Sequence, residues 1–218
     1  MGYTGAVRRG GDADVRELPT LTIGKVSVGP MDNNAYLLTC RETGDRLLVD
    51  AADDASTLLA LVGDDGLGQV VTTHQHRDHW QALAEVVAAT GARTLAGRAD
   101  SEGIPVPTDV LLDDGDRVSV GRVELEVIGL VGHTPGSVAL LYRDPDGHPH
   151  LFTGDSLFPG GVGNTQGDAE RFASLIDDVE HRLFDRLPDD TWFYPGHGAD
   201  STLGAERAAL PEWRSRGW

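Results

Sequence analysis

One short segment constrains this chain more than any other. VVTTHQHRDHW, residues 70–80, follows an apolar, β-branched run and carries three histidines and an aspartate within six positions. His74 and His76 alternate by two, and Asp78 and His79 come directly after them. A strand end and the turn behind it can direct such side chains into one small space. The segment therefore predicts a metal site at the end of a strand.

Three further segments place a ligand-type side chain at a predicted strand end, beside glycine. They are LVGHTPGS with His133, LFTGDSLF with Asp155, and FYPGHG with His197. Glycine lets the backbone turn sharply at these points, so each side chain can lean into a shared pocket. Zinc and similar ions take neutral imidazole and carboxylate ligands, and a catalytic site keeps a position open for water.

Together these residues suffice for two ions. The candidate ligands are His74, His76 and His133 for one ion, Asp78, His79 and His197 for a second, and Asp155 as the bridge between them. Two cations a few ångströms apart repel each other, so an anionic bridge is physically required.

The order of predicted elements indicates an α/β sandwich. Strands are expected at 21–29, 34–40 and 46–52 as an antiparallel meander, then at 68–74 and 93–97, and in a second half at 116–121, 123–132, 137–144, 148–158 and 191–198. Helices are expected at 54–63, 79–91 and 168–188, with Asp54 and Asp168 as N-caps. Two strand-rich halves, each followed by helix, predict two sheets packed face to face with helices outside, in four layers.

Length and charge narrow the class of protein. The 218 residues fit a single domain, 1–218, in which residues 1–17 are expected to form a flexible N-terminus. The formal net charge of −17 repels phosphate backbones, so nucleic acid and anionic membranes are not expected as partners. No secretory signal or membrane span is visible, which favours a cytoplasmic protein. A small-molecule substrate and a monomeric or homodimeric state are expected. The single cysteine, Cys40, excludes an internal disulfide and is expected as a buried strand thiol.

The order HxHxDH, GHTPGS, GD and GH resembles the metallo-β-lactamase superfamily, and the chain is closest in style to its glyoxalase II-like hydrolases. The resemblance runs from about residue 21 to residue 198. It implies the four-layer αβ/βα sandwich and two divalent metal ions, zinc first, with iron or manganese as alternatives. It also implies hydrolysis of a small ester, thioester or lactone, with a metal-bound hydroxide as the nucleophile.

The same resemblance assigns roles to three carboxylates. Asp78 and Asp155 are the carboxylates of the reacting centre, and Asp78 is expected as a ligand to the second ion rather than as a general base. Asp50, in LLVDAA, is expected to accept a hydrogen bond from a metal-binding imidazole. Asp50 is equally well explained as a turn residue whose side chain caps the next helix.

The chain also departs from known branches of the superfamily. The glutathione-thioester hydrolases carry a basic C-terminal helical extension, whereas about twenty residues follow His197 here. Asn164 stands where many relatives have arginine, and Trp80 stands where a small aliphatic residue is common. The antibiotic-degrading branch uses a cysteine ligand, and Cys40 is in the wrong region for that role. Whether glutathione is involved stays open.

Two other functions remain. The persulfide dioxygenases of the superfamily resemble this chain in motif and use one iron, held by residues that match His74, His133 and Asp155. A non-catalytic metal-binding protein is the third reading, against which the intact set of seven residues argues.

Several residues outside the motifs are expected to have structural roles. His148 and His150 are placed in a solvated hairpin turn, and His181 on an exposed helix face. Trp213 and Trp218 are expected to pack in a core or a dimer interface.

Overall fold

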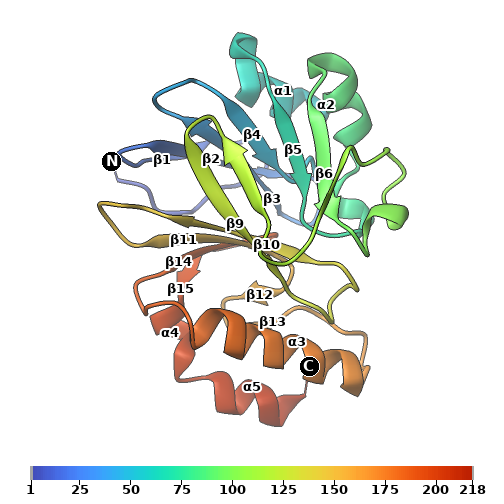
Figure 1. The fold of residues 1–218 in the computed structure, drawn as a ribbon, viewed down its shortest axis with the longest axis vertical. Helices are drawn as coiled ribbons and strands as arrows, with labels where there is room; N and C mark the ends of the chain where they lie inside the picture. Colours follow the sequence, from blue (N-terminus) through green and yellow to red (C-terminus); the bar gives the residue numbers. More distant parts are fainter. Residues whose placement is uncertain (1, 218) are drawn as a thin grey trace.

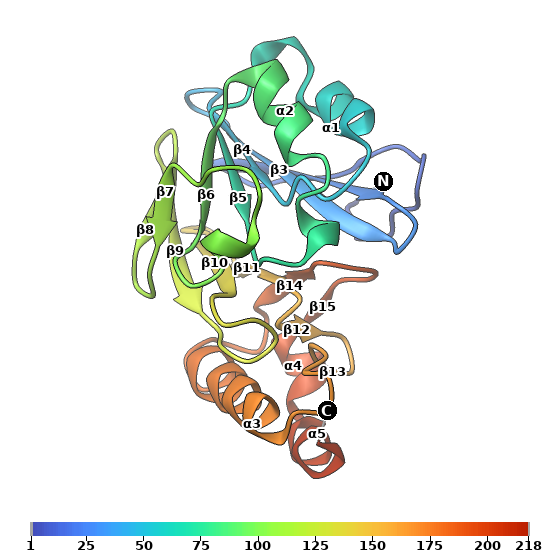
Figure 2. The same cartoon turned by 90° about the vertical axis from the view of Figure 1, so that its right-hand side faces the viewer.

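The molecule is built as four layers, with two β-sheets in the middle and helices on both outer faces. The computed structural model describes residues 2–217. Figures 1 and 2 show helices α1 and α2 covering the first sheet and helices α3, α4 and α5 beside the second. The expected αβ/βα sandwich is therefore confirmed.

The first sheet has seven strands in sequence order, β1 to β7. They are β1 (Asp14–Glu17), β2 (Leu21–Val28), β3 (Asn33–Cys40), β4 (Arg46–Val49), β5 (Gln69–Thr72), β6 (Arg93–Gly97) and β7 (Val110–Leu112). Strands β1 to β4 pair antiparallel, which confirms the meander, and β4 to β7 pair parallel.

The second sheet has six strands in the order β15-β14-β11-β10-β9-β8. They are β8 (Arg117–Val120), β9 (Val123–Gly129), β10 (Val138–Arg143), β11 (Pro149–Gly154), β14 (Trp192–Pro195) and β15 (Ser201–Thr202). A separate hairpin of β12 (Leu157–Phe158) and β13 (Gly161–Val162) follows β11.

Five α-helices and four turns of other helical types complete the described chain. The α-helices are α1 (Ala55–Val62), α2 (Leu83–Thr90), α3 (Ala169–Asp178), α4 (Leu203–Arg207) and α5 (Leu210–Arg216). The other turns are η1 (Gly63–Asp65), η2 (Arg77–His79), η3 (Ser101–Gly103) and the π-helical turn η4 (Val179–Phe184). Asp54 and Asp168 cap α1 and α3 as expected, because their side chains accept hydrogen bonds from backbone N–H groups of the first turn. No helix among these combines the length and apolar character of a membrane span.

Three apolar clusters hold the layers together. The central one lies between the sheets and includes Leu38 and Val49 from the first sheet and Leu140 and Phe152 from the second. A second cluster joins the first sheet to α1 and α2, and a third joins the second sheet to α3 and α5. Each element therefore buries one face against a neighbouring layer.

Strand direction decides where the candidate ligands lie. Strands β4 and β5 are parallel, so their carboxyl ends share one edge of the first sheet. Strand β11 is parallel to β14, and β9 and β11 are both antiparallel to β10, which lies between them. Strands β9, β11 and β14 therefore run in the same direction and end at one edge of the second sheet. The segments after β5, β9, β11 and β14 carry the predicted ligands.

Some expectations about local structure need correction. The helix expected at 79–91 begins at Leu83 in the structure, because residues 77–79 form the turn η2. The helix expected to reach Pro188 changes to the π-helical turn η4 after Asp178. Asp14–Glu17 form β1, so the last part of the expected flexible N-terminus is paired in the sheet. Mobility of residues 2–13 stays a prediction.

His150 is the clearest error. It was expected in a solvated turn, but β11 already begins at Pro149, and His150 is fully buried between the rings of Tyr142 and Tyr194. Its Nδ1 lies 2.8 Å from the Tyr194 hydroxyl, and burial lowers the pKa of this imidazole to about 3. Trp213 does pack in the core as expected, whereas Trp218 lies outside the described residues.

Trp213 allows a test of the outer layer. This side chain is buried against the Phe184 ring at 6.2 Å between ring centroids. Trp213→Ala should lower the free energy of unfolding by about 3–5 kcal/mol in urea denaturation, because it leaves a large cavity. The neighbouring exposed Ser215→Ala should change it by less than about 0.5 kcal/mol. Equal effects of the two variants would contradict the packing of α5.

Candidate metal centre

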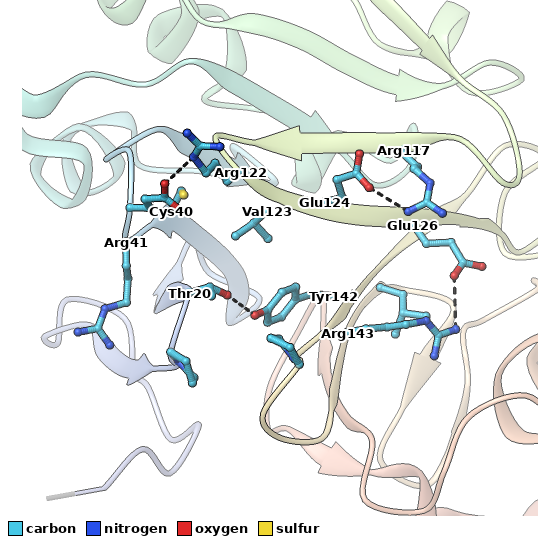
Figure 3. Close-up of a pocket in the computed structure, with 14 residues that line it drawn as sticks. Thr20, Cys40, Arg41, Arg117, Arg122, Val123, Glu124, Glu126, Tyr142 and Arg143 are labelled. Atoms are coloured by element: carbon cyan, nitrogen blue, oxygen red, sulfur yellow. Dashed lines mark hydrogen bonds and ion pairs between the residues drawn. The ribbon is translucent and has the colours of Figure 1, made fainter.

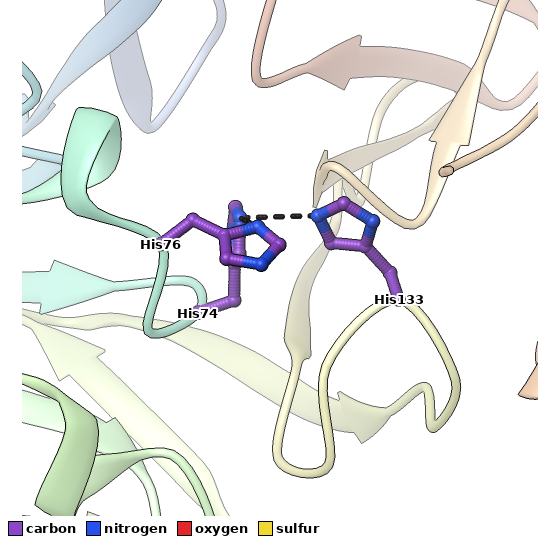
Figure 4. A group of neighbouring side chains, drawn as sticks. All are labelled: His74, His76 and His133. Atoms are coloured by element: carbon purple, nitrogen blue, oxygen red, sulfur yellow. Dashed lines mark hydrogen bonds between the residues drawn. The ribbon is translucent and has the colours of Figure 1, made fainter. Parts of the chain in front are cut away.

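Three histidines converge from two loops to form the first group. His74 and His76 follow β5, and His133 follows β9. His74 Nε2 lies 3.1 Å from His76 Nδ1 and 3.3 Å from His133 Nε2. Figure 4 shows the side chains of His74 and His76 on one side and that of His133 on the other, reaching toward one another.

The second group combines two histidines with an aspartate. Asp78 and His79 lie in η2, and His197 follows β14. His79 Nε2 is 3.2 Å from His197 Nε2, which is 3.3 Å from Asp78 Oδ2. Asn33 on β3 donates to the same carboxylate oxygen at 3.0 Å, so Asp78 is fixed from a further strand.

Asp155 lies between the two groups. Its Oδ2 is 3.7 Å from His133 Nε2 and 3.4 Å from His197 Nε2, and its Oδ1 is 3.3 Å from His79 Nε2. Oδ1 is buried and has no hydrogen-bond partner among the described residues. All seven predicted residues are thus brought together, and Asp155 has the central position that the sequence indicated.

In four of the histidines the ring nitrogen Nδ1, which points away from the cluster, already has a hydrogen-bond partner. His133 Nδ1 donates to the carbonyl of Asn164 at 2.8 Å, and His197 Nδ1 to the carbonyl of Met31 at 2.9 Å. His79 Nδ1 lies 2.8 Å from Asp50 Oδ2, and His74 Nδ1 lies 3.1 Å from the Thr73 hydroxyl. A carbonyl or carboxylate can only accept, so in neutral His79, His133 and His197 the Nε2 atom carries a lone pair.

Facing lone pairs require a cation between them. His79 Nε2 and His197 Nε2 point at each other and at two carboxylates, an arrangement that is unfavourable unless a proton or a metal ion lies between. Tetrahedral coordination at the usual zinc–nitrogen distance puts two ligand nitrogens roughly 3.3 Å apart. The nitrogen separations of 3.1 to 3.3 Å in both groups match that value. The residues therefore fit two divalent ions.

The pKa shifts in the metal-free chain follow from the same crowding. Burial would lower the pKa of His79 and His197, but the neighbouring carboxylates overcome it, raising that of His79 well above its usual value and that of His197 to about 10. Burial, with the neighbouring imidazoles, lowers the pKa of His74 and His133, so these two are neutral at pH 7. Burial would raise the pKa of Asp155, yet the imidazoles hold it well below its usual range.

Asp50 supports the site and does not cap the next helix. Its Oδ2 accepts from His79 and from the Thr73 hydroxyl, and its Oδ1 accepts from the Thr73 backbone N–H at 2.7 Å. The helix cap is Asp54 instead. Of the two readings left open by the sequence, the geometry favours the imidazole-orienting one.

Glycine at position 196 allows the cluster to close. A Cβ there would lie 2.2 Å from Asp155 Oδ1 and 2.6 Å from His79 Cε1. Any side chain at this position would displace one of the two groups. The sequence indicated only that the chain turns at this glycine. The structure shows that the absence of a side chain here leaves room for Asp155 and His79.

A buried ion pair that the sequence analysis missed fixes the loop after His197. Lys25 on β2 is fully buried, and its Nζ donates to Asp200 Oδ1 at 2.6 Å and to the carbonyl of Gly198 at 2.8 Å. The signal was a lysine inside the otherwise apolar strand LTIGKVSVG. A lysine is rarely buried without a partner, so this one indicated an unseen carboxylate.

A cavity of about 880 Å³, whose lining residues are drawn in Figure 3, includes none of the candidate ligands in its lining. It opens at the Cys40 end of β3, whereas Asn33 at the start of that strand contacts Asp78, roughly 23 Å away for eight extended residues. Cys40 is buried, as expected for a strand thiol. Most of the charged side chains that line the cavity pair with each other, including Arg117 with Glu124 at 3.0 Å. The chemistry-bearing cluster is therefore elsewhere.

Comparison with known proteins agrees with this geometry. The family model described as the metallo-beta-lactamase superfamily matches residues 28–197. A hydroxyacylglutathione hydrolase from Polaromonas sp. (strain JS666) is 40% identical over 167 residues, which are 76% of this chain and 62% of that protein. The chain thus spans less than two thirds of the length of that relative.

Solved structures extend the similarity to the fold. The di-iron-bound form of TTHA1623 is 32% identical with a TM-score of 0.70, and the match covers 84% of this chain and 96% of that one. ETHE1 from Myxococcus xanthus is 27% identical with a TM-score of 0.77, covering 88% of this chain and 84% of that one. From the family match and the shared fold, this chain belongs to the metallo-β-lactamase superfamily, as a glyoxalase II-like member.

Proposed function

We propose that the chain is a dinuclear metal-dependent hydrolase of a small ester, thioester or lactone. The observation that carries the proposal is the position of Asp155, which is within 4 Å of imidazoles from both groups. A single carboxylate shared by two sets of ligands is the arrangement that two neighbouring cations need. The name of the Polaromonas relative, a hydroxyacylglutathione hydrolase, supports thioester hydrolysis.

Divalent ions held by the two groups and Asp155 would supply a water of lowered pKa and would polarise the substrate carbonyl. Three of the ligands are already in the protonation state that metal binding needs, whereas His79 and His197 must give up a proton to the metal ion. His74 and His133 are neutral at pH 7, and the Asp155 carboxylate is ionised. The carbonyls of Asn164 and Met31 fix the rings of His133 and His197, so the site is preorganised before substrate arrives.

We expect an apolar group in the substrate, because an aromatic ring borders the candidate ligands. The Phe158 ring lies 6.3 Å from the His197 ring. Asn164 is exposed and offers no charge where an anionic tripeptide would need one, so a substrate other than a glutathione thioester remains part of the proposal.

An oxygenase with one iron is the second candidate. The three residues that would hold that iron lie together, since Asp155 Oδ2 is 4.0 Å from His74 Nε2 and 3.7 Å from His133 Nε2. The complete second group, Asp78, His79 and His197, favours the dinuclear hydrolase instead. The identity and number of bound ions decide between the two.

Metal content and hydrolysis test the proposal together. Protein purified without added metal or chelator should carry close to two ions per chain by inductively coupled plasma mass spectrometry, and should hydrolyse a member of a panel of thioesters, esters and lactones. Asp155→Ala should lose most of both ions and at least about 100-fold of the activity, because it removes the shared ligand. Exposed His181→Ala should keep both ions and full activity.

The outcomes against the proposal are distinct. One iron per chain, with oxygen uptake and no hydrolysis, would move the oxygenase to the front. Full metal content in Asp155→Ala would show that the seven residues are not one site.

Metal binding should depend on pH with a defined sign. In the metal-free chain the pKa of His197 is about 10, so this imidazole carries a proton at neutral pH that a metal ion must displace. Affinity for zinc should therefore rise as pH rises from about 6 to about 9, and binding should release protons. Isothermal titration in two buffers of different ionisation enthalpy measures that release. An affinity independent of pH over this range would contradict the assignment of His197.

A further inference from the structure

A buried carboxylate outside the seven residues lies under the first group. Asp100 follows β6 and is fully buried. Its side chain bonds neither His74 nor His133 directly, yet its two oxygens accept hydrogen bonds from the loops that carry these residues. A buried carboxylate is costly unless donors satisfy it, so these bonds are needed to hold it in place.

The donors come from two different loops. Asp100 Oδ2 accepts from the backbone N–H of Gln75 at 2.9 Å, and Gln75 stands between His74 and His76. The same oxygen accepts from the Thr134 hydroxyl at 2.5 Å, and Oδ1 accepts from the backbone N–H of Gly136 at 2.6 Å. Thr134 directly follows His133. One side chain therefore joins the two loops that meet in the first group.

The loop after His133 also fits closely against the end of β6. A Cβ on Gly136 would lie 2.5 Å from the backbone nitrogen of Asp100. The backbone is therefore in direct contact at this point, and the carboxylate bonds act over a short, rigid path. A shift of the Asp100 side chain must move the segment that carries His133.

We propose that Asp100 is a positioning residue for the ion held by His74, His76 and His133, and that it acts by fixing the distance between their two loops. The inference rests on the metal centre of the proposed function. The second group has supports that do not involve Asp100, since Asp50 holds His79 as well as Thr73 before His74, and Lys25 holds the loop after His197. Loss of Asp100 therefore lowers the affinity for the ion of the first group and leaves the affinity for the other ion unchanged.

Asn at position 100 tests this with little change of shape. An amide has one acceptor oxygen and turns its NH₂ group toward a donor, so at least one loop is released. Metal-free Asp100→Asn, titrated with Co²⁺ and followed by visible absorption and by competition with a chelator, should bind one ion about 10- to 100-fold more weakly than wild type. The other ion should bind unchanged. In a His133→Ala background, Asp100→Asn should cause no further loss.

The chain offers a matched control. Asp109 also accepts from a backbone N–H and a threonine hydroxyl, both of Thr94 near the start of β6. Asp109→Asn should bind both ions like wild type. Thr134→Val should weaken the binding of the same ion, and Thr134→Ser, which keeps the hydroxyl, should bind it like wild type. This pair keeps the test available if the Asp100 variant does not fold.

Two results would overturn the inference. Wild-type affinity for both ions in Asp100→Asn and Thr134→Val would remove any role of Asp100 in the site. Equal weakening of both ions, with a matching fall in the melting temperature of the metal-free protein, would show a general structural role. Wild-type protein that binds no Co²⁺ would instead overturn the metal centre itself.

Discussion

The site depends on imidazole nitrogens that converge on one another and on the carboxylates of Asp78 and Asp155. Nδ1 of His79, His133 and His197 is committed to Asp50, Asn164 and Met31, so each Nε2 is left to face the cluster. Without a metal ion the neighbouring carboxylates keep His79 and His197 protonated at neutral pH, because such a convergence is unfavourable without a cation. A bound metal ion would take the place of these protons, so the surrounding protein has to hold the groups in the same positions in both states.

The sandwich provides that rigidity through strand direction. Strands β9, β11 and β14 run the same way in one sheet, and β4 and β5 run the same way in the other. The two carboxyl edges carry the ligands, while an apolar core between the sheets fixes their separation. Separate polar contacts then adjust each group, with Asp100 under the first and Lys25 beside the second. Such sites need support beyond the ligands themselves.

The ligand set was readable from the sequence because each ligand follows an apolar strand and stands within two positions of glycine or another ligand. The supporting residues were not. Asp100, in GRADSEG, has the sequence context of an ordinary turn aspartate, and only the fold brings Gln75 and Gly136 to it. His150 was misjudged because the Asp-Gly turn before it suggested exposure, whereas the ring is buried between two tyrosines. Contacts between residues far apart in the chain are not encoded in local pattern.

The central claim is that two ions lie on either side of Asp155. The most direct measurement is anomalous X-ray diffraction from zinc-loaded crystals, recorded on both sides of the zinc absorption edge. The account predicts two peaks roughly 3.5–4 Å apart, one among His74, His76 and His133 and the other among Asp78, His79 and His197. A single peak at the first group, or peaks away from Asp155, would contradict it.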